Sequence, residues 1–278
     1  MCDAATMTSV AGIAGVFDRA AQTYDDVGVE WFRPIAAGLV AELAARPGER
    51  VLDIGCGRGA ALTPLARAVG ATGYALGIDL APAMVARTAA DLRELPQVEV
   101  RVADAAAPGL APASFDIVAS SLVLFFLDDP AAAVGGWARL LVPGGRLGVT
   151  TFGAQDERWR RTDAVFAPYL PPAMRDARTS GTRGPFASDS GMEHLLRGAG
   201  LVDVRTATRT VVARFRDAAH LVEFSWSHGQ RAMWEAVPEP DREAVRHGIV
   251  DSMRGFSDDD GTLSLSQEVR YTMARRSR

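Results

Sequence analysis

The sequence contains no lysine, only two cysteines, and no apolar run of the roughly 18 residues that a membrane-spanning helix needs. Every basic residue is therefore an arginine, which we attribute to coding bias in the source organism. The cysteines, Cys2 and Cys56, cannot form a disulfide framework and do not have the spacing of metal ligands. We therefore expect no metal site, no membrane span and a reduced, cytoplasmic location.

The sequence also lacks an excess of positive charge, because its net charge is -4 at pH 7. Phosphate backbones attract a basic face, so this balance counts against a nucleic-acid partner. Residues 1–10 lack the basic start and apolar core of a secretory signal. The 278 residues, 48% of them hydrophobic, suffice for one large domain or two small ones. Since no linker is visible, we expect a single domain over residues 1–278.

The first half of the chain alternates between short apolar runs, which predict strands, and stretches with apolar residues at helical spacing. The predicted strands cover residues 50–54, 74–78, 98–102, 115–119 and 145–151. The predicted helices cover residues 10–24, 29–45, 60–69, 82–93 and 130–141. This alternation predicts right-handed crossovers and a parallel sheet covered on both faces. Ligands of such sheets bind at the carboxyl ends of the strands.

The second half of the chain does not continue this alternation of predicted strands and helices. Residues 153–188 are polar and rich in proline, with scattered aromatics that include Trp159, Phe166 and Tyr169. After them we predict helices at 191–199, 218–237 and 241–253, and strands at 202–215 and 262–274. The alternation in the last segment is typical of an edge strand or an antiparallel strand.

A glycine-rich loop follows the first predicted strand, with the sequence Asp-Ile-Gly-Cys-Gly-Arg-Gly from Asp53 to Gly59. Glycine suits this place because the turn is tight and a ligand must approach the backbone closely. Asp79 ends the second strand, where a carboxylate can accept hydrogen bonds from both hydroxyls of a ribose. Gly55, Gly57 and Ala60 also satisfy the dinucleotide-binding pattern, so the loop alone leaves two cofactor classes open.

Three further features favour one of these classes: Asp53 two residues before Gly55, a third glycine at Gly59, and Asp104 at the end of the third strand. Phe-Asp-Ile-Val at 115–118 and Leu-Val-Pro-Gly-Gly at 141–145 follow in order. With five matches in order, namely the glycine-rich loop, Asp79, Asp104 and these two segments, the sequence resembles the class I S-adenosylmethionine (SAM)-dependent methyltransferases over nearly its whole length. The stretch from Phe17 to Asp25 is similar to a helix that closes over SAM in the branch containing quinone and natural-product methyltransferases.

The resemblance implies an α/β fold, Rossmann-like and doubly wound, with a seven-stranded, mostly parallel sheet whose last strand is antiparallel. The fold would consist of N-terminal helices (1–47), a SAM-binding core (48–152), and an inserted helical acceptor lid with the last two strands (153–278). It implies SAM as cofactor, S-adenosylhomocysteine as product and a small-molecule acceptor.

The resemblance also implies roles for individual residues. Asp53, Gly55 and Gly57 would hold the methionine end of SAM, and Asp79 would bind its ribose. Several further residues would complete the cofactor site: Tyr24 at the carboxylate end, Leu80 and Met84 at the adenine, Asp104 and Ala105 at its amino group, and Ser120 and Ser121 from the fourth strand. Asp79 and Asp104 also fit an ordinary helix-capping or turn role, and the serines also fit a purely backbone role.

A base for the acceptor is harder to identify. His228, in Trp-Ser-His-Gly at 226–229, is our candidate, although a single histidine also fits a structural role. The fourth strand is expected to end in Leu124-Phe125-Phe126, where many relatives carry two histidines and where phenylalanine cannot accept a proton. Phe125 and Phe126 suit either core packing or an aromatic or polyketide-like acceptor.

The sequence therefore predicts methyl transfer to oxygen or carbon of a small, aromatic or polyketide-like metabolite. One alternative is a SAM-binding protein of the same fold with a non-methylating role, such as a cyclase. Another is an NAD(P)-linked oxidoreductase, although a Ser/Tyr/Lys catalytic set is impossible without lysine. The acceptor's identity and the oligomeric state stay open.

Overall fold

A computed structural model describes residues 10–172, 174 and 183–278; Cys2 and the first nine residues of the segment examined for a secretory signal lie outside them. The chain forms two compact units. Unit 1 takes its described residues from Met1–Trp31, Ala154–Thr179 and Thr210–Glu268. Unit 2 takes them from Phe32–Gly153, Ser180–Arg209 and Val269–Arg278. Among the described residues, no helix is long and apolar enough to cross a bilayer.

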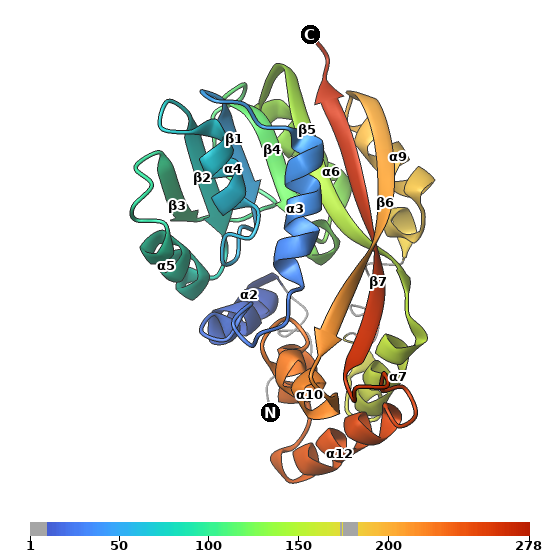
Figure 1. Ribbon diagram of the computed structural model, residues 1–278. Coiled ribbons are helices and arrows are strands. Elements are labelled where there is room, and N and C mark those ends of the chain that lie inside the picture. The colour runs from blue at the N-terminus through green and yellow to red at the C-terminus, as the bar shows by residue number, and fades with distance from the viewer. Residues whose placement is uncertain (1–9, 173, 175–182) are drawn as a thin grey trace. The chain divides into compact units, whose positions relative to one another are not determined.

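The seven strands found among the described residues form one sheet in the order β3-β2-β1-β4-β5-β7-β6. β1 pairs in parallel with β2 and β4, and the parallel pairing extends to β3 and β5. β7 runs antiparallel to the other six (Figure 1). Their bounds are β1 Arg50–Ile54, β2 Tyr74–Asp79, β3 Val98–Val102, β4 Phe115–Ser121, β5 Leu141–Gln155, β6 Leu201–Phe215 and β7 Leu263–Arg276. The predicted Rossmann-like sheet with an antiparallel last strand is confirmed.

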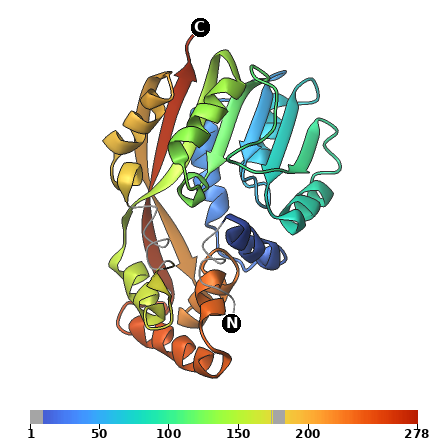
Figure 2. The ribbon, with the colours of Figure 1, turned by 180° about the vertical axis from the view of Figure 1, so that it is seen from behind.

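Helices cover both faces of the sheet in unit 2. α3 (Phe32–Leu43) and α4 (Leu62–Val69) lie on one face, and α6 (Pro130–Leu140) and α9 (Asp189–Gly198) lie on the other (Figures 1 and 2). α5 (Pro82–Asp91) packs on β2 and β3. Because both faces are covered, the central strands are buried on both sides, which is why they appear as continuous apolar runs in the sequence.

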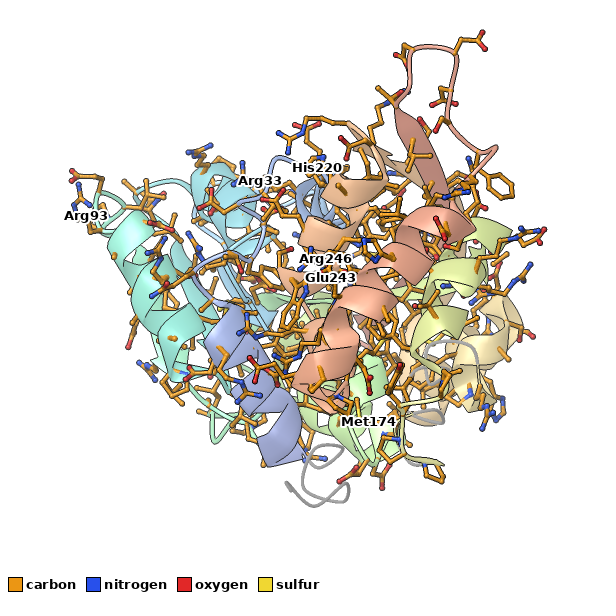
Figure 3. All side chains as sticks on the ribbon, turned by 90° about the horizontal axis from the view of Figure 1, so that it is seen from below. Arg33, Arg93, Met174, His220, Glu243 and Arg246 are labelled. Atoms are coloured by element: carbon orange, nitrogen blue, oxygen red, sulfur yellow. The ribbon has the colours of Figure 1, made fainter. Side chains whose placement is uncertain are left out.

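Unit 1 gathers helices around an aromatic core. They are α2 (Val10–Ala20), α7 (Glu157–Phe166), α10 (Ala218–Trp226), α11 (Arg231–Ala236) and α12 (Arg242–Ser252). Trp31, Trp159, Phe215 and Phe224 pack there, with ring centroids 5.5 Å apart in the Trp31–Trp159 and Phe215–Phe224 pairs. Figure 3 shows His220 on α10, and Glu243 and Arg246 close together on α12.

Two sequence predictions, the helix over 218–237 and the end of the fourth strand, were wrong in detail, and two others gain detail from the structure. The helix expected over 218–237 is two helices, because residues 227–230 form turns closed by Ser227 N–H to Phe224 O and Arg231 N–H to His228 O. The polar stretch 153–188 contains α7, which the Asp156 carboxylate caps by accepting from Arg158 N–H. Leu124–Phe126 is a short 3-10 helix and not the end of β4. β7 lies between β5 and β6, so it is antiparallel but not an edge strand.

Two other 3-10 helices, Gly184–Ala187 and Glu239–Asp241, also occur in the described part of the chain. Strand β5 begins four residues earlier and ends four residues later than predicted. The extra length carries the strand from unit 2 into unit 1, and β6 and β7 cross between the units in the same way.

Candidate functional site

The acidic residues singled out in the sequence meet at one edge of unit 2, at the carboxyl ends of parallel strands. Asp53 near the end of β1 lies in register with Gly77 of β2, and Asp79 at the end of β2 with Val102 of β3. Asp104 follows β3 by two residues, and the intervening Ala103 N–H donates to Asp79 O at 3.0 Å. The parallel register therefore brings these three carboxylates to the same edge.

The glycine loop between β1 and α4 is held against β2. The backbone amides of Gly55 and Cys56 both donate to Ile78 O, at 2.8 and 2.9 Å. Gly55 has φ +70°, and a Cβ there would overlap the side chain of Val123. Gly57 has φ +49°. The loop thus needs glycine both for its left-handed backbone and for the close approach of the segment after β4.

Asp79 ties the loop to the start of α5. Its Oδ2 accepts from Gly57 N–H and its Oδ1 from Ala81 N–H, each at 2.9 Å. Burial raises the pKa of this carboxyl, and the backbone amides of Ala81, Gly57 and Leu80 partly offset the rise. Each carboxylate oxygen has a second lone pair, so an orientated Asp79 retains acceptor capacity for two ligand hydroxyls.

Asp53 is the most unusual group of the site. Its side chain is 1% exposed, and among the described residues neither carboxylate oxygen has a hydrogen-bond partner of ordinary geometry. Burial raises the pKa of Asp53 to about 7; the nearby backbone amide of Leu62 opposes the rise, and the charge of Asp79 adds to it. A buried carboxylate with two unsatisfied oxygens is a strong acceptor for a cationic ligand group.

Cys56, between the two loop glycines, is a packed residue. Burial raises the pKa of its thiol well above the usual range, and the charges of Asp53 and Asp79 add to the rise. The thiol is therefore protonated and unreactive at neutral pH.

The residues assigned to the adenine lie next to these carboxylates. Met84, on α5, is buried, and Leu80, two residues before α5, is half-buried. Asp104 Oδ1 accepts from Ala106 N–H at 2.8 Å, and Ala105 O accepts from the Trp137 indole at 2.8 Å. Asp104 thus has the turn-capping role that the sequence left open, and its contact with adenine stays a prediction.

The two serines of β4 use their side chains inside the sheet. Ser120 Oγ donates to Ile54 O at 3.0 Å. Ser121 Oγ is 3.0 Å from Thr150 Oγ1, which also accepts from Leu122 N–H. These hydroxyls join β4 to β1 and β5, which favours the purely backbone role for both residues.

An aromatic cluster follows β4 in unit 2. Phe125 stacks on Phe152, with centroids 5.6 Å apart, and meets Phe186 edge-on at 6.3 Å. Arg270 holds this cluster: its guanidinium donates to Phe152 O at 2.7 Å, to Phe186 O at 2.9 Å and to Asp189 at 2.7 Å. The sequence did not single out Arg270, since its partners are at least 80 residues away along the chain.

Tyr24 and His228, the other two predicted site residues, belong to unit 1. Tyr24 follows α2 and meets Phe17 edge-on at 6.1 Å. His228 Nδ1 lies 2.7 Å from Phe224 O, and burial lowers the pKa of the imidazole to about 4. His220 instead has a structural role, because Nδ1 accepts from Arg216 N–H and Nε2 donates to Val27 O. The functional roles of Tyr24 and His228 stay predictions.

Comparison with known proteins places this site in a family. A methyltransferase domain model matches residues 52–149. Nocamycin O-methyltransferase of Saccharothrix syringae is 41% identical over 243 residues, covering 83% of this chain and 86% of that protein. Aklanonic acid methyltransferase of Streptomyces sp. (strain C5) is 40% identical over 164 residues, which cover 58% of this chain and 74% of that protein.

Solved structures share the fold at low sequence identity. A phosphoethanolamine N-methyltransferase of Haemonchus contortus in complex with SAM has a TM-score of 0.58 at 16% identity. The match covers 94% of this chain and 57% of the Haemonchus contortus chain. The [4+2]-cyclase SpnF has a TM-score of 0.52 at 21% identity, and the match covers 88% of this chain and 81% of the SpnF chain. The same fold therefore occurs in proteins described as a methyltransferase and as a cyclase.

Proposed function

Because the chain belongs to the class I SAM-dependent methyltransferases, we propose that it methylates an acidic oxygen of a small aromatic or polyketide-like metabolite. The observation that carries the cofactor half of this proposal is Asp53, a buried carboxylate whose two oxygens have no partner among the described residues. The acceptor half rests on the relatives, one named as an O-methyltransferase and one as a methyltransferase of an acid.

The residues of unit 2 fit SAM. The cofactor's ammonium group would satisfy the Asp53 carboxylate, and its ribose hydroxyls would donate to the remaining lone pairs of Asp79. Gly55 and Gly57 leave room for the methionine end beside these acids. Leu80 and Met84 would contact the adenine, with Asp104 and Ala105 at its amino group. The role of Tyr24 at the carboxylate end rests on its motif alone, because Tyr24 belongs to unit 1.

When bound, SAM supplies a methyl group on a positively charged sulfur, ready for in-line attack. The chain's task is then to orient the acceptor and to manage its proton. Phe125 and Phe126 cannot accept a proton, and the flat, apolar rings of the Phe125 cluster would suit an aromatic acceptor.

His228 is our candidate for the proton acceptor. Donation from Nδ1–H to Phe224 O leaves the lone pair of the neutral ring on Nε2. A pKa of about 4 keeps the imidazole neutral at pH 7 but makes it a weak base. A weak base suits an acceptor that ionises easily, such as an enol, an acidic phenol or a carboxylic acid.

The test is incubation with methyl-labelled SAM and a metabolite extract of the source organism, read by mass spectrometry. We expect a labelled product whose fragments place the methyl group on oxygen; a methyl group on carbon would refute the oxygen assignment. Asp79→Ala should weaken SAM binding at least about 100-fold, because it removes two charge-assisted hydrogen bonds of roughly 1.5–3 kcal/mol each. Unchanged affinity would refute the cofactor assignment, and Asp128→Asn, at an exposed carboxylate, is the control.

The cyclase alternative keeps the SAM site and predicts binding without turnover. Phe125 and Phe126, in place of a base, are the observation in its favour. SAM binding without a labelled product, with an extract known to contain aromatic and polyketide-like acids, would favour it. Family membership removes the basis for the oxidoreductase alternative. The single-domain organisation, the cytoplasmic location and the absence of a nucleic-acid partner stay predictions.

A further inference from the structure

The turn that interrupts the predicted helix 218–237 carries two buried polar groups without partners. Trp226 ends α10, and Gln230 precedes α11, four residues later. Within the described part of the chain, Trp226 Nε1 and Gln230 Oε1 are buried and have no hydrogen-bond partner. Folded proteins rarely leave such groups unsatisfied, so each requires an explanation. One is a donor and the other an acceptor.

The Trp226 ring is fixed in place. It stacks on Trp234 with centroids 4.9 Å apart and planes 17° from parallel. The guanidinium carbons of Arg231 and Arg242 each lie 5.6 Å from the Trp226 ring centroid. Packing between these groups prevents the indole from turning to find an acceptor. Trp234 differs, because its own Nε1–H donates to Ser225 Oγ at 2.8 Å.

The Gln230 amide is also fixed. Its Nε2 donates to Asp163 Oδ1 at 2.9 Å. An ionised carboxylate only accepts hydrogen bonds, so this contact determines which end of the amide faces Asp163 and directs Oε1 away from it. Gln155 donates to the other oxygen of the same carboxylate at 3.4 Å, and its carbonyl is not among the unsatisfied groups. The two glutamines therefore share a partner, but only Gln230 offers a buried acceptor.

We propose that the segment Trp226–Gln230 recognises a planar hydroxy-carbonyl compound. A carbonyl oxygen of the ligand accepts from Trp226 Nε1–H, and a ligand hydroxyl donates to Gln230 Oε1. His228, the candidate base, lies in the middle of this segment. The inference rests on the proposed function, because we take this compound to belong to the same chemical class as the methyl acceptor. It assigns to Gln230 a recognition role that the sequence analysis did not foresee.

The test measures binding of 6-hydroxy-1-tetralone and of 1-tetralone, which lacks the hydroxyl, to the full-length protein saturated with S-adenosylhomocysteine. Isothermal titration at millimolar ligand suits fragments of this size. Trp226→Phe and Gln230→Met each remove one unsatisfied group while keeping most of the side-chain volume. Their matched controls are Trp234→Phe, whose indole already has a partner, and Gln155→Met, which also donates to Asp163.

We expect Trp226→Phe to weaken binding of both compounds about fivefold to tenfold, the worth of one neutral hydrogen bond. Gln230→Met should weaken only 6-hydroxy-1-tetralone by a similar factor, and Gln155→Met should bind like the wild type. Trp234→Phe, which loses part of the stack on Trp226 but keeps the Trp226 donor, should weaken binding less than Trp226→Phe. Trp226→Phe should lower the unfolding temperature less than Trp234→Phe, because only Trp234 also loses an indole hydrogen bond. This separates recognition from a structural role.

Equal affinity in Trp226→Phe and Trp234→Phe, or no binding of 6-hydroxy-1-tetralone at millimolar concentration, would overturn the proposal and leave a buried water as the partner of these groups. Binding is measured without methyl transfer, so the result is separable from the proposed function. A labelled methyl product with unchanged affinities would refute only this inference. Affinities that change as expected, without any labelled product, would support the site and refute the proposed reaction.

Discussion

Replacing Asp53 with asparagine should stabilise the protein without cofactor at neutral pH. The folded protein raises the pKa of Asp53 from 3.8 to about 7. A difference of roughly three units, at about 1.4 kcal/mol each, corresponds to about 4 kcal/mol. Because the side chain is 1% exposed, solvent screening does not reduce this figure much.

The sign of the effect follows from proton binding. Since the folded pKa lies above the unfolded one, the folded state holds a proton that the unfolded chain has released between about pH 4 and pH 7. The wild type therefore loses stability as the pH rises through this range. The side-chain amide of Asp53→Asn does not ionise, so the advantage of the variant should grow from zero near pH 4 to about 4 kcal/mol above pH 7.

Urea unfolding across this pH range measures the advantage as a rise in the midpoint at constant slope. Titration with S-adenosylhomocysteine should show the opposite effect of the same substitution, because the variant cannot pair with the cofactor's ammonium group. Cofactor affinity of the wild type should rise with pH up to about 7, by at most about tenfold per unit, and affinity of Asp53→Asn should change less. Asp128→Asn, at an exposed carboxylate, should behave like the wild type.

Two results would refute this reasoning. A variant less stable than the wild type at about pH 8 would show that the ionised Asp53 has a stabilising partner in the folded protein. A wild-type cofactor affinity that is the same at about pH 6 and pH 8 would show that the carboxyl is already ionised at the lower value.

Three other substitutions test separate parts of the structure. Gly55→Ala should lower the free energy of unfolding by about 2–4 kcal/mol, since its Cβ meets Val123, whereas Gly109→Ala, which also has a positive φ but has open space around it, should cost about 1 kcal/mol; equal costs in urea unfolding would contradict the packing argument. Arg270→Met should lower the free energy of unfolding by about 2–3 kcal/mol, because it removes the hydrogen bonds to two backbone carbonyls and to Asp189, and Arg270→Lys should be intermediate. An unchanged midpoint in thermal unfolding would refute the stabilising role of Arg270. His228→Gln should lower kcat by less than the roughly 10²–10⁴-fold typical of a base whose pKa lies near the working pH, with cofactor affinity unchanged, and the wild-type rate should fall on acidification only near pH 4; a fall near pH 6.5 would contradict the buried imidazole.

Most of unit 2 could be predicted from the sequence because its strands are covered on both faces. Such strands are continuous apolar runs that end at glycines, and β1 and β3 begin and end at the predicted residues. The acids at the strand ends could be identified for the same reason, since the carboxyl ends of parallel strands share one edge.

Unit 1 was harder to predict because its helices are short and polar on the outside. Helix α7 has a buried stripe formed by Trp159, Thr162 and Phe166. The many charged residues around them make the segment polar on average, so its composition does not indicate a packed helix. The break at 227–230 has a single glycine and no proline, which is a weak signal against a continuous helix.

The electrostatic properties of the site depend on distant pairs that no local pattern marks. The sequence shows that Asp53 precedes a glycine loop, but not that its carboxylate is buried without a partner. Gln230 is orientated by Asp163, 67 residues away, and Arg270 by Phe152, 118 residues away. Such contacts follow only from the folded arrangement.

The interleaved path of the chain bears on how such enzymes exchange parts. Each unit is assembled from three separate stretches, and β5, β6 and β7 each contribute residues to both. A single genetic crossover between two homologous genes therefore cannot transplant one unit whole. A chimera that keeps each unit intact has to exchange all three of its stretches together, with junctions inside β5, β6 and β7. Stepwise substitution within one stretch needs no such junctions.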